Sequence, residues 1–366
     1  MNLNAWKLWT LDGRPAARTE ETVQARVGAG ARPRPPGANH YYIHTVEASP
    51  TPGRALAAAS RIGALAPAAG HLVHMPAHVY ARTGDHEAAA KANLAGAEAD
   101  RAYLKDKPAD NFYGMAYYSH NLHFLADSEM MQGRLSKARE ASTALAERLA
   151  PHTAMMPMVE SMITMDTAVL LRFARHDEVL ARPAPPADHP VETAFWHFAR
   201  SVALARTGKA DEAAAERNAM QRAAAAVPEG ALFGGTGLES ARTILVLAGA
   251  VLDARIAWAR GAQAEAIARW RRAVSLADAV PYDEPPIWFY PVRESLGAAL
   301  LLSGDPAGAE AVFRDDLRRF PRNARSLFGL HESLVRQGRT ADAQWVKRQL
   351  DEAWKHGEMP LTLESL

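Results

Sequence analysis

The segment GDPAGAEAVFRDDLRRFPRNARSLFGL, residues Gly304 to Leu330, decides the fold class of this chain. Its apolar residues recur three and four positions apart, which is the spacing of one buried helical face. Gly304 and Asp305 mark a turn before the first helix, and Pro321 follows that helix where a proline ends it readily. The segment therefore predicts one helix, a short connection and the start of a second helix.

The same alternation of helical spacing and short turns recurs from residue 40 onward. The interval from Gly304 to Gly338 is 34 residues and that from Arg175 to Gly208 is 33, close to the period of about 34 of one class of helical-hairpin repeats. We therefore predict an all-α fold, a helical-hairpin repeat array. Six short turns separate the paired helices: Thr83-Gly84-Asp85, Gln132-Gly133-Arg134, Thr207-Gly208-Lys209, Arg260-Gly261-Ala262, Ser303-Gly304-Asp305 and Gln337-Gly338-Arg339.

These segments resemble tetratricopeptide repeats (TPR) over most of residues 40–355, with small residues after the turns (Ala89, Ala138, Ala309) and Pro321 closing a second helix. More narrowly, GANHYYIHTVEASP, GHLVHMPAHVYARTGD, YYSHNLHFL and DEPPIWFYPVRESLGAALL resemble a group of bacterial repeat proteins, a resemblance that gives a fold and no activity. It implies a right-handed TPR-like α-solenoid whose first helices line a concave groove. In that group AWKLWTLDGRPA follows several earlier helices, so we expect this chain to be short at its amino-terminal end.

Composition narrows the classes of function. The chain has 42 basic and 41 acidic residues, so no net field favours nucleic acid or a membrane as a partner. No basic stretch followed by an apolar run opens the sequence, which predicts a cytoplasmic protein as written, although a longer native amino terminus would change this. Cysteine is absent, so any metal must use nitrogen or oxygen ligands. The oligomeric state is left open.

Proline-rich stretches divide the chain into three predicted parts. Residues 1–38 carry several prolines and glycines and are expected to form an extended or partial amino-terminal segment. Residues 39–181 are expected to form histidine-rich hairpins, and residues 190–358 a second set of hairpins. The stretch from Arg182 to Pro190 is the predicted joint between the two sets.

The histidines have an unusual spacing. Counted back from the turn glycines Gly84 and Gly133, the same offsets of 13, 10 and 6 residues carry polar side chains. Positions three and four apart in a helix share one face, with Cβ atoms about 5–6 Å apart, close enough to share an ion. The predicted metal ligands are His40, His44, Glu47, His71, His74, His78, His120, His123 and Asp127.

We expect a transition metal ion, namely copper, iron or zinc, because imidazole suits all three. One ligand set consistent with the spacing is His44, His74 and His123, with a carboxylate from Glu47 or Asp127. Two of the histidines, His71 and His78, are two helical turns apart, about 10.5 Å, so seven histidines suit two ions better than one. A purely structural origin, a proton-sensing role and a peptide-binding groove are the competing interpretations.

A second candidate region runs from Tyr282 to Arg293 and contains four aromatic residues, two acids and an arginine. Trp288, Tyr290 and Arg293 could clamp a small-molecule or peptide ligand, with the guanidinium binding a carboxylate. An ordinary helix start, with Arg293 paired to Glu294 or to a neighbouring helix, is the alternative.

Three classes of function remain open. The first is a repeat protein whose amino-terminal groove binds one or two metal ions and a small or peptide ligand. The second is a metal-dependent oxidase, oxygenase or hydrolase. No nucleophile elbow, phosphate loop or His-Glu-x-x-His motif is present, so catalysis would need the metal. The third is a metal-free scaffold for protein interactions.

Overall fold

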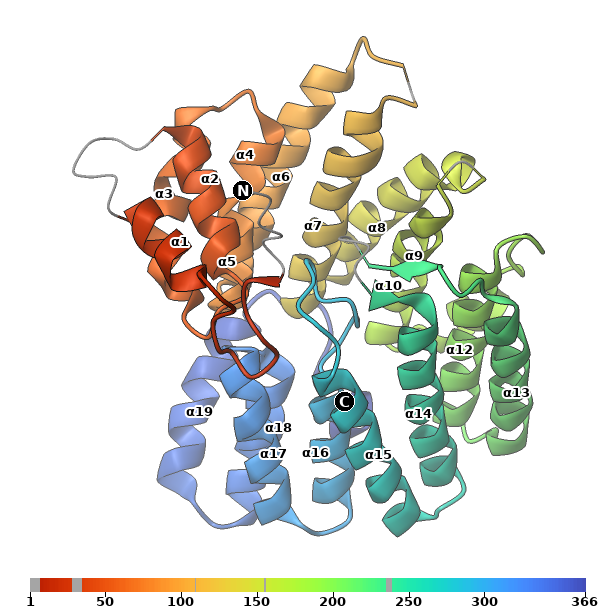
Figure 1. The fold of residues 1–366 in the computed structure, drawn as a ribbon. Helices are drawn as coiled ribbons and strands as arrows, with labels where there is room; N and C mark the ends of the chain where they lie inside the picture. The colour runs from red at the N-terminus through yellow and green to blue at the C-terminus, as the bar shows by residue number, and fades with distance from the viewer. Residues whose placement is uncertain (1–6, 28–34, 109, 155, 235–238) are drawn as a thin grey trace.

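The computed structural model describes residues 7–27, 35–108, 110–154, 156–234 and 239–366, and these residues form an all-α array of helical hairpins (Figure 1). The helices of the first half are α1 (Thr19–Val27), α2 (Pro36–Val46), α3 (Leu56–Leu65), α4 (Gly70–His74), α5 (Pro76–Arg82), α6 (His86–Leu104), α7 (Ser119–Met131), α8 (Leu135–Leu149), α9 (Glu160–Ile163), α10 (Met165–Arg172) and α11 (His176–Ala181).

The second half contains four longer hairpins. Its helices are α12 (Pro190–Arg206), α13 (Ala210–Ala226), α14 (Ala241–Ala259), α15 (Gln263–Asp278), α16 (Val292–Leu302), α17 (Pro306–Arg319), α18 (Ala324–Arg336) and α19 (Thr340–Ala353). Short elements are the 3-10 helices η2 (Pro52–Ala55), η4 (Ala150–His152), η5 (Pro157–Val159) and η6 (Leu363–Ser365), the π-helical turn η3 (Gly114–Tyr118), and the antiparallel strands β1 (Leu232–Phe233) and β2 (Glu239–Ser240), which pair Leu232 with Ser240.

The hairpins form where the sequence predicts them. All six predicted turn glycines have φ between 71° and 84°, the left-handed conformation that ends a helix and that glycine adopts without strain. Ala89, Ala138 and Ala309 have 0% of their surface exposed. Their small side chains let the two helices of a hairpin approach closely.

The two ends of the array touch. A Cβ atom on Gly84, in the α5–α6 turn, would lie 2.0 Å from the carbonyl oxygen of Pro321, in the α17–α18 turn. A Cβ atom on Gly133 would lie 2.4 Å from the ring of Trp354, which follows α19. In Figure 1 the blue helices α17 to α19 accordingly lie directly beneath the red and orange amino-terminal helices. The array is therefore closed on itself.

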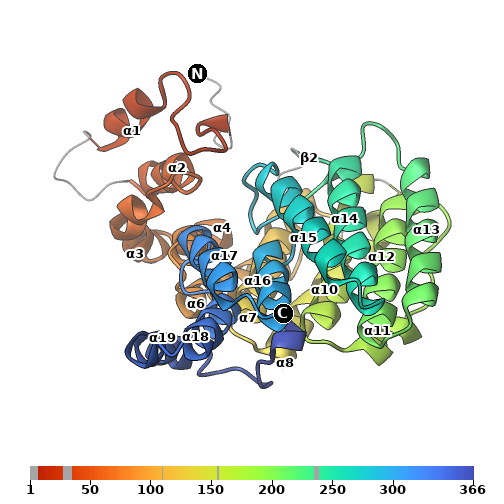
Figure 2. The ribbon, with the colours of Figure 1, turned by 90° about the horizontal axis from the view of Figure 1, so that it is seen from below.

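The hydrophobic core is almost continuous. One cluster of buried residues runs from Ala90 to Leu366 and includes side chains on both sides of the connection at residues 182–190. A smaller cluster, from Val23 to Val79, belongs to α1–α5, of which Figure 2 shows α1–α3 set off to one side. The proposed division into residues 39–181 and 190–358 stays a prediction.

Part of the amino-terminal segment, which is expected to be extended or partial, is helical. Within residues 1–38, α1 occupies Thr19–Val27, while residues 1–6 and 28–34 lie outside the described part. Glu20 and Glu21 lie in the first turn of α1, where carboxylates interact favourably with the helix dipole. Val23 is fully buried in the smaller core cluster. No helix among the described residues is long and apolar enough to span a membrane.

Candidate metal centre

Seven of the nine predicted ligands gather in one cluster, together with an eighth side chain from the far end of the sequence. His40 and His44 come from α2, and Glu47 follows its last turn. His71 and His74 come from α4, His78 from α5, and His120 from the first turn of α7. Glu284 comes from the connector between α15 and α16, residues 279–291. The cluster therefore joins five segments of chain.

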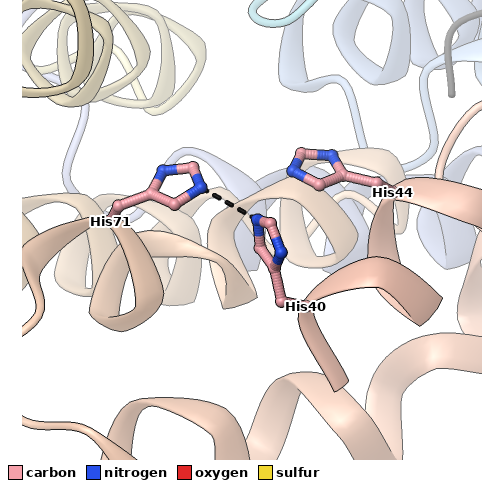
Figure 3. A group of neighbouring side chains, drawn as sticks. All are labelled: His40, His44 and His71. Carbon is pink, nitrogen blue, oxygen red and sulfur yellow. Dashed lines mark hydrogen bonds between the residues drawn. The ribbon is translucent and has the colours of Figure 1, made fainter. Parts of the chain in front are cut away.

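The outer triad consists of His40, His44 and His71, all half-buried (Figure 3). The Nε2 atoms of His40 and His71 are 2.9 Å apart, so one of the two rings donates its hydrogen to the other. The rings of His40 and His44 have centroids 4.8 Å apart. One nitrogen from each residue lies within 4.8 Å of the other two. The three rings therefore converge on a common point.

The inner triad consists of His74, His78 and His120. His74 and His78 have 0% of their surface exposed, and their Nε2 atoms are 3.4 Å apart. The ring of His120 is 5.0 Å from that of His74 and 5.6 Å from that of His78, measured between centroids. One nitrogen from each of the three residues again lies within 4.8 Å of the others.

The carboxylate pair, Glu47 and Glu284, lies between the two triads. Glu47 accepts a hydrogen bond from His44 Nδ1 at its Oε1 atom, at 2.6 Å, and from His78 Nδ1 at its Oε2 atom, also at 2.6 Å. Glu284 Oε2 accepts from the same His78 Nδ1 at 2.7 Å. Tyr282 donates its hydroxyl to Glu47 Oε2 at 3.3 Å. Glu47 thus links one histidine of each triad.

The charges of this buried group are strongly coupled. Burial disfavours the charged form of His78, yet Glu284 and Glu47 raise its pKa to about 10. Burial also opposes ionisation of Glu47, but His78 and His44 hold the pKa of Glu47 well below its usual range. Burial and the negative charge of Glu47 raise the pKa of Glu284. One imidazolium and one carboxylate therefore balance at neutral pH, beside a second carboxyl group that retains its proton more readily.

The pKa values of three other imidazoles of the cluster are lowered, which favours their neutral form. Burial, reinforced by the charge of His40, lowers the pKa of His71 to about 3. Burial, reinforced by the charge of His78, lowers the pKa values of His74 and His120 well below the usual histidine range. Neutral imidazole is the form that offers a lone pair to a metal ion.

Neighbouring polar groups hold the ligand rings in place. Asn93 of α6 lies with its Oδ1 atom 3.3 Å from His74 Nδ1. Tyr113 accepts the backbone N–H of His71 at 3.3 Å and donates its hydroxyl to Asp100 at 2.7 Å. Hydrogen bonds to the far nitrogen of a ligand histidine fix its tautomer and orientation in metal sites.

Two predicted ligands, His123 and Asp127, do not enter these groups within the described part of the chain. His123 is half-buried, and its buried Nδ1 atom has no hydrogen-bond partner. Burial raises the pKa of Asp127 to about 7, and the nearby Arg172 counteracts this rise only in part. The expected set of His44, His74 and His123 is therefore not brought together: His44 belongs to the outer triad and His74 to the inner one.

The side chains expected to clamp a ligand are engaged in packing. Trp288 and Tyr290 are buried in the large hydrophobic cluster. Arg293 donates two hydrogen bonds to Asp278, at 2.6 and 2.7 Å, and a third to Asp315 at 2.6 Å. The carboxylates that Arg293 binds therefore belong to its own fold, and neither is the neighbouring glutamate considered from the sequence.

Sequence reasoning missed Glu284 as a member of the histidine cluster. The surrounding stretch, Tyr282 to Arg293, stands out for its acids and aromatic residues, which are consistent with a ligand clamp or with an ordinary helix start but do not indicate a histidine partner. Glu284 is 206 residues from its partner His78 in the sequence. The one local signal in the sequence is that prolines and aromatic residues, which are often buried, surround Glu284 and the neighbouring acid.

Comparisons with known proteins add little to this geometry. Neither a family model nor a curated protein matches the chain. The solved structure of the assembly chaperone of RpL4 (Acl4, residues 1–338) is similar over 89% of this chain and 98% of its own, with 13% identity and a TM-score of 0.28. At that identity and TM-score the likeness carries no functional argument.

Proposed function

We propose that this protein is a tetratricopeptide-type repeat protein that binds two transition-metal ions, one in the outer triad and one in the inner triad. The observation that carries the proposal is the position of Glu47, whose two oxygen atoms each accept the Nδ1 hydrogen of a histidine from a different triad. Such hydrogen bonds leave the Nε2 atoms of His44 and His78 for metal binding, which at His78 would displace one proton of the imidazolium. Glu47 would then orient ligands of both ions.

The spacing of the nitrogen atoms supports two mononuclear sites. With bonds of about 2.0–2.1 Å, two tetrahedral ligand atoms lie about 3.4 Å apart, and two at a right angle about 2.9 Å apart. The Nε2 atoms of His74 and His78 are separated by 3.4 Å, and those of His40 and His71 by 2.9 Å. The pairs already have the separations that a shared ion requires.

The donor set narrows the metal to copper, iron or zinc. Three imidazoles without a thiolate suit these ions, whereas oxygen-rich sites suit magnesium or calcium. A different arrangement places one ion among His44, Glu47, His78 and Glu284, whose ligand atoms also lie within 4.8 Å of one another. In that arrangement both carboxylates bind the ion directly.

Elemental analysis of protein purified without a histidine tag or chelator tests the proposal. We expect about two equivalents of metal, one of which is lost in His40→Ala and the other in His74→Ala. His356→Ala is the matched control, because His356 lies on the surface after α19 and outside the cluster. Less than about a tenth of an equivalent after reconstitution would overturn the proposal.

A metal-dependent enzyme is the second candidate, favoured by the number of ligands in each triad. Three protein ligands leave at least one position free on a four- to six-coordinate ion, as in catalytic zinc sites. Oxygen consumption by copper- or iron-loaded protein, and ester hydrolysis by zinc-loaded protein, would test this role. Activity that disappears in His74→Ala but survives in His356→Ala would support it.

A metal-free interaction scaffold is the third candidate. A trough of about 680 Å³ lies between α13 and α15, with α14 as its floor. Its lining combines apolar side chains such as Leu245, Val246 and Leu276 with the exposed Arg272. A peptide or protein partner bound there would not depend on the histidine cluster, so its binding should survive chelation.

A further inference from the structure

Four arginines from four different hairpins lie close enough to one another to interact electrostatically or to share the ring of Tyr290. They are Arg172 of α10, Arg206 of α12, Arg255 of α14 and Arg325 of α18, here called the arginine cluster. The guanidinium carbons of Arg172 and Arg255 each lie 5.9 Å from the centre of the Tyr290 ring. Arg206 and Arg255 influence each other electrostatically, as do Arg325 and Arg206.

The arginine cluster has fewer neighbouring carboxylates than are needed to pair with its four guanidinium groups. Arg172 is ion-paired with Glu294. Among the described residues, no carboxylate lies within ion-pair distance of Arg206, Arg255 or Arg325. Arg325 is nevertheless 4% exposed. Because a buried charge without a counter-ion is strongly unfavourable, the buried Arg325 beside the half-buried Arg206 and Arg255 needs an explanation.

The groups that do contact these arginines are neutral. Arg255 donates to the hydroxyls of Tyr290 and Ser295, both at 3.3 Å. Arg325 donates to the carbonyl oxygens of Ser365, at 2.7 Å, and of Arg172. Burial and the neighbouring arginines lower the pKa values of Arg206 and Arg325 to about 9 each, although Glu364 partly compensates at Arg206 and Glu294 at Arg325.

We propose that the arginine cluster is a binding site for an oxyanion, a phosphate or carboxylate group, held chiefly by Arg206 and Arg255. A guanidinium offers two parallel N–H donors that match the oxygen atoms of either group. Both arginines are only half-buried, so an anion can reach them from solvent. The hydroxyl of Tyr290, which accepts a hydrogen bond from Arg255, provides a further donor beside it.

The last residues of the sequence lie at the edge of this site. Ser295 donates its hydroxyl to the backbone oxygen of Leu366 at 2.9 Å, while accepting from Arg255. Figure 2 shows this segment beside α16. Arg255 is therefore linked through Ser295 to Leu366, the residue after η6, and an anion bound to Arg255 should also stabilise the segment from Thr362 to Leu366.

Anion titration of the chelator-treated protein tests the site. Thermal unfolding is followed against inorganic phosphate and, separately, against citrate, at constant ionic strength set with chloride. We expect a saturable rise in Tm with at least one of the two anions. Arg206→Gln and Arg255→Gln should each weaken the affinity for that anion by about tenfold to a hundredfold. Arg260→Gln, an exposed arginine near the end of α14 that pairs with Asp211, should leave the affinity unchanged.

Each outcome decides the proposal. A response to phosphate alone, or to citrate alone, identifies which oxyanion the site takes. Equal effects of chloride and the two anions, or an undiminished response in both glutamine variants, would overturn it. If Arg255→Gln does not fold, Arg206→Lys, which keeps the charge but loses the two-pronged donor, should still weaken binding. Because metal is removed beforehand, this result does not depend on the histidine cluster.

Discussion

Glu47 contacts one histidine of each triad and so connects the two triads. If it orients ligands from outside both coordination spheres, Glu47→Gln should keep about two equivalents of metal but weaken the affinity by about tenfold to a hundredfold. A glutamine keeps the shape of the side chain but can accept from only one of the two imidazoles through its single carbonyl oxygen. Competition with a chromophoric chelator measures the affinity.

Glu332→Gln is the control for this variant, since Glu332 pairs only with the surface residue His331. Complete loss of one equivalent in Glu47→Gln would place Glu47 directly on the metal and favour the site formed with Glu284.

Asp316 provides a test of stability against pH at a distance from the histidines. Burial, reinforced by the charge of Glu294, raises the pKa of Asp316 to about 7. A raised carboxyl pKa stabilises the folded state below the unfolded value of about 4, and this stabilisation is lost as the pH rises to about 7. Between pH 5 and pH 8 the free energy of unfolding should therefore fall by roughly 2 kcal/mol more in the wild type than in Asp316→Asn.

Urea unfolding at the two pH values measures this difference. Asp351→Asn, on the exposed face of α19 in an ion pair with Lys347, should show the wild-type dependence. Parallel pH dependences for Asp316→Asn and the wild type would mean that Asp316 is already ionised at pH 5.

At the residue scale, the spacing of histidines identified most of the candidate site but not its boundaries. Equal offsets from the turn glycines led us to expect that His123 and Asp127 would match His74 and His78. The helical segment that carries His74 and His78 is interrupted at Met75, where α4 ends and α5 begins with Pro76. By contrast, α7 continues unbroken through residues 119–131. Equal offsets therefore do not give equal directions, and only the first of the α7 residues faces the cluster.

At the scale of elements, the position of the inner triad depends on how closely α4 approaches α6. A Cβ atom on Gly96 of α6 would lie 2.7 Å from His74 Cβ and 3.0 Å from the carbonyl oxygen of Gly70. In an exposed helix, replacing glycine by alanine is favourable by about 1 kcal/mol. Here the overlap should outweigh that gain, and Gly96→Ala should destabilise the protein by about 1–3 kcal/mol and weaken metal binding at the inner triad.

Chemical denaturation together with metal titration checks both effects. Gly37→Ala in α2 is the control, because nothing lies within 4 Å of its Cβ position. Unchanged stability in Gly96→Ala would mean that α4 shifts easily relative to α6.

The connector between α15 and α16 shows what a local pattern can and cannot predict. Its prolines and aromatic residues correctly indicated the beginning of a helix after Pro291. The partners of its charged residues could not be deduced, since Arg293 binds Asp278 and Asp315 while Glu284 reaches His78. Pairings of this kind depend on the path of whole hairpins and leave no periodic signal.

At the scale of the whole molecule, the histidine cluster ties α5 to the connector between α15 and α16. Glu284 follows α15, and its partner His78 lies in α5. If metal bound near these residues stabilises only the folded state, a free-metal concentration a hundredfold above Kd should add about 2.7 kcal/mol. Chelation should therefore lower the Tm of the metal-loaded wild type by several degrees. It should leave the Tm of His74→Ala less affected.

Differential scanning calorimetry with and without chelator measures this shift. His356→Ala should respond as the wild type does. A Tm that is insensitive to chelation in protein shown to contain two equivalents would mean that the ions bind the unfolded chain equally well.

The repeat fold itself could be predicted from the sequence, but its closure could not. Turn glycines and apolar spacing identified the hairpins, because each hairpin is specified by its own residues. The contact of Gly84 with Pro321 results from small rotations accumulated over many hairpins. No single segment encodes that sum, so the meeting of the two ends, and with it the placement of Glu284, became visible only in the folded structure.

Closure also limits how such a chain can change in length. An open solenoid accepts an extra hairpin wherever two repeats meet, because each repeat contacts only its neighbours. Here a hairpin duplicated between α8 and α15 would carry Glu284 one repeat away from His78, and one added after α19 would displace the segment in which Trp354 packs on Gly133. The number of hairpins thus determines the geometry of the site. Duplication of a hairpin, a route by which repeat proteins diversify, would here separate Glu284 from His78 or displace Trp354 from Gly133.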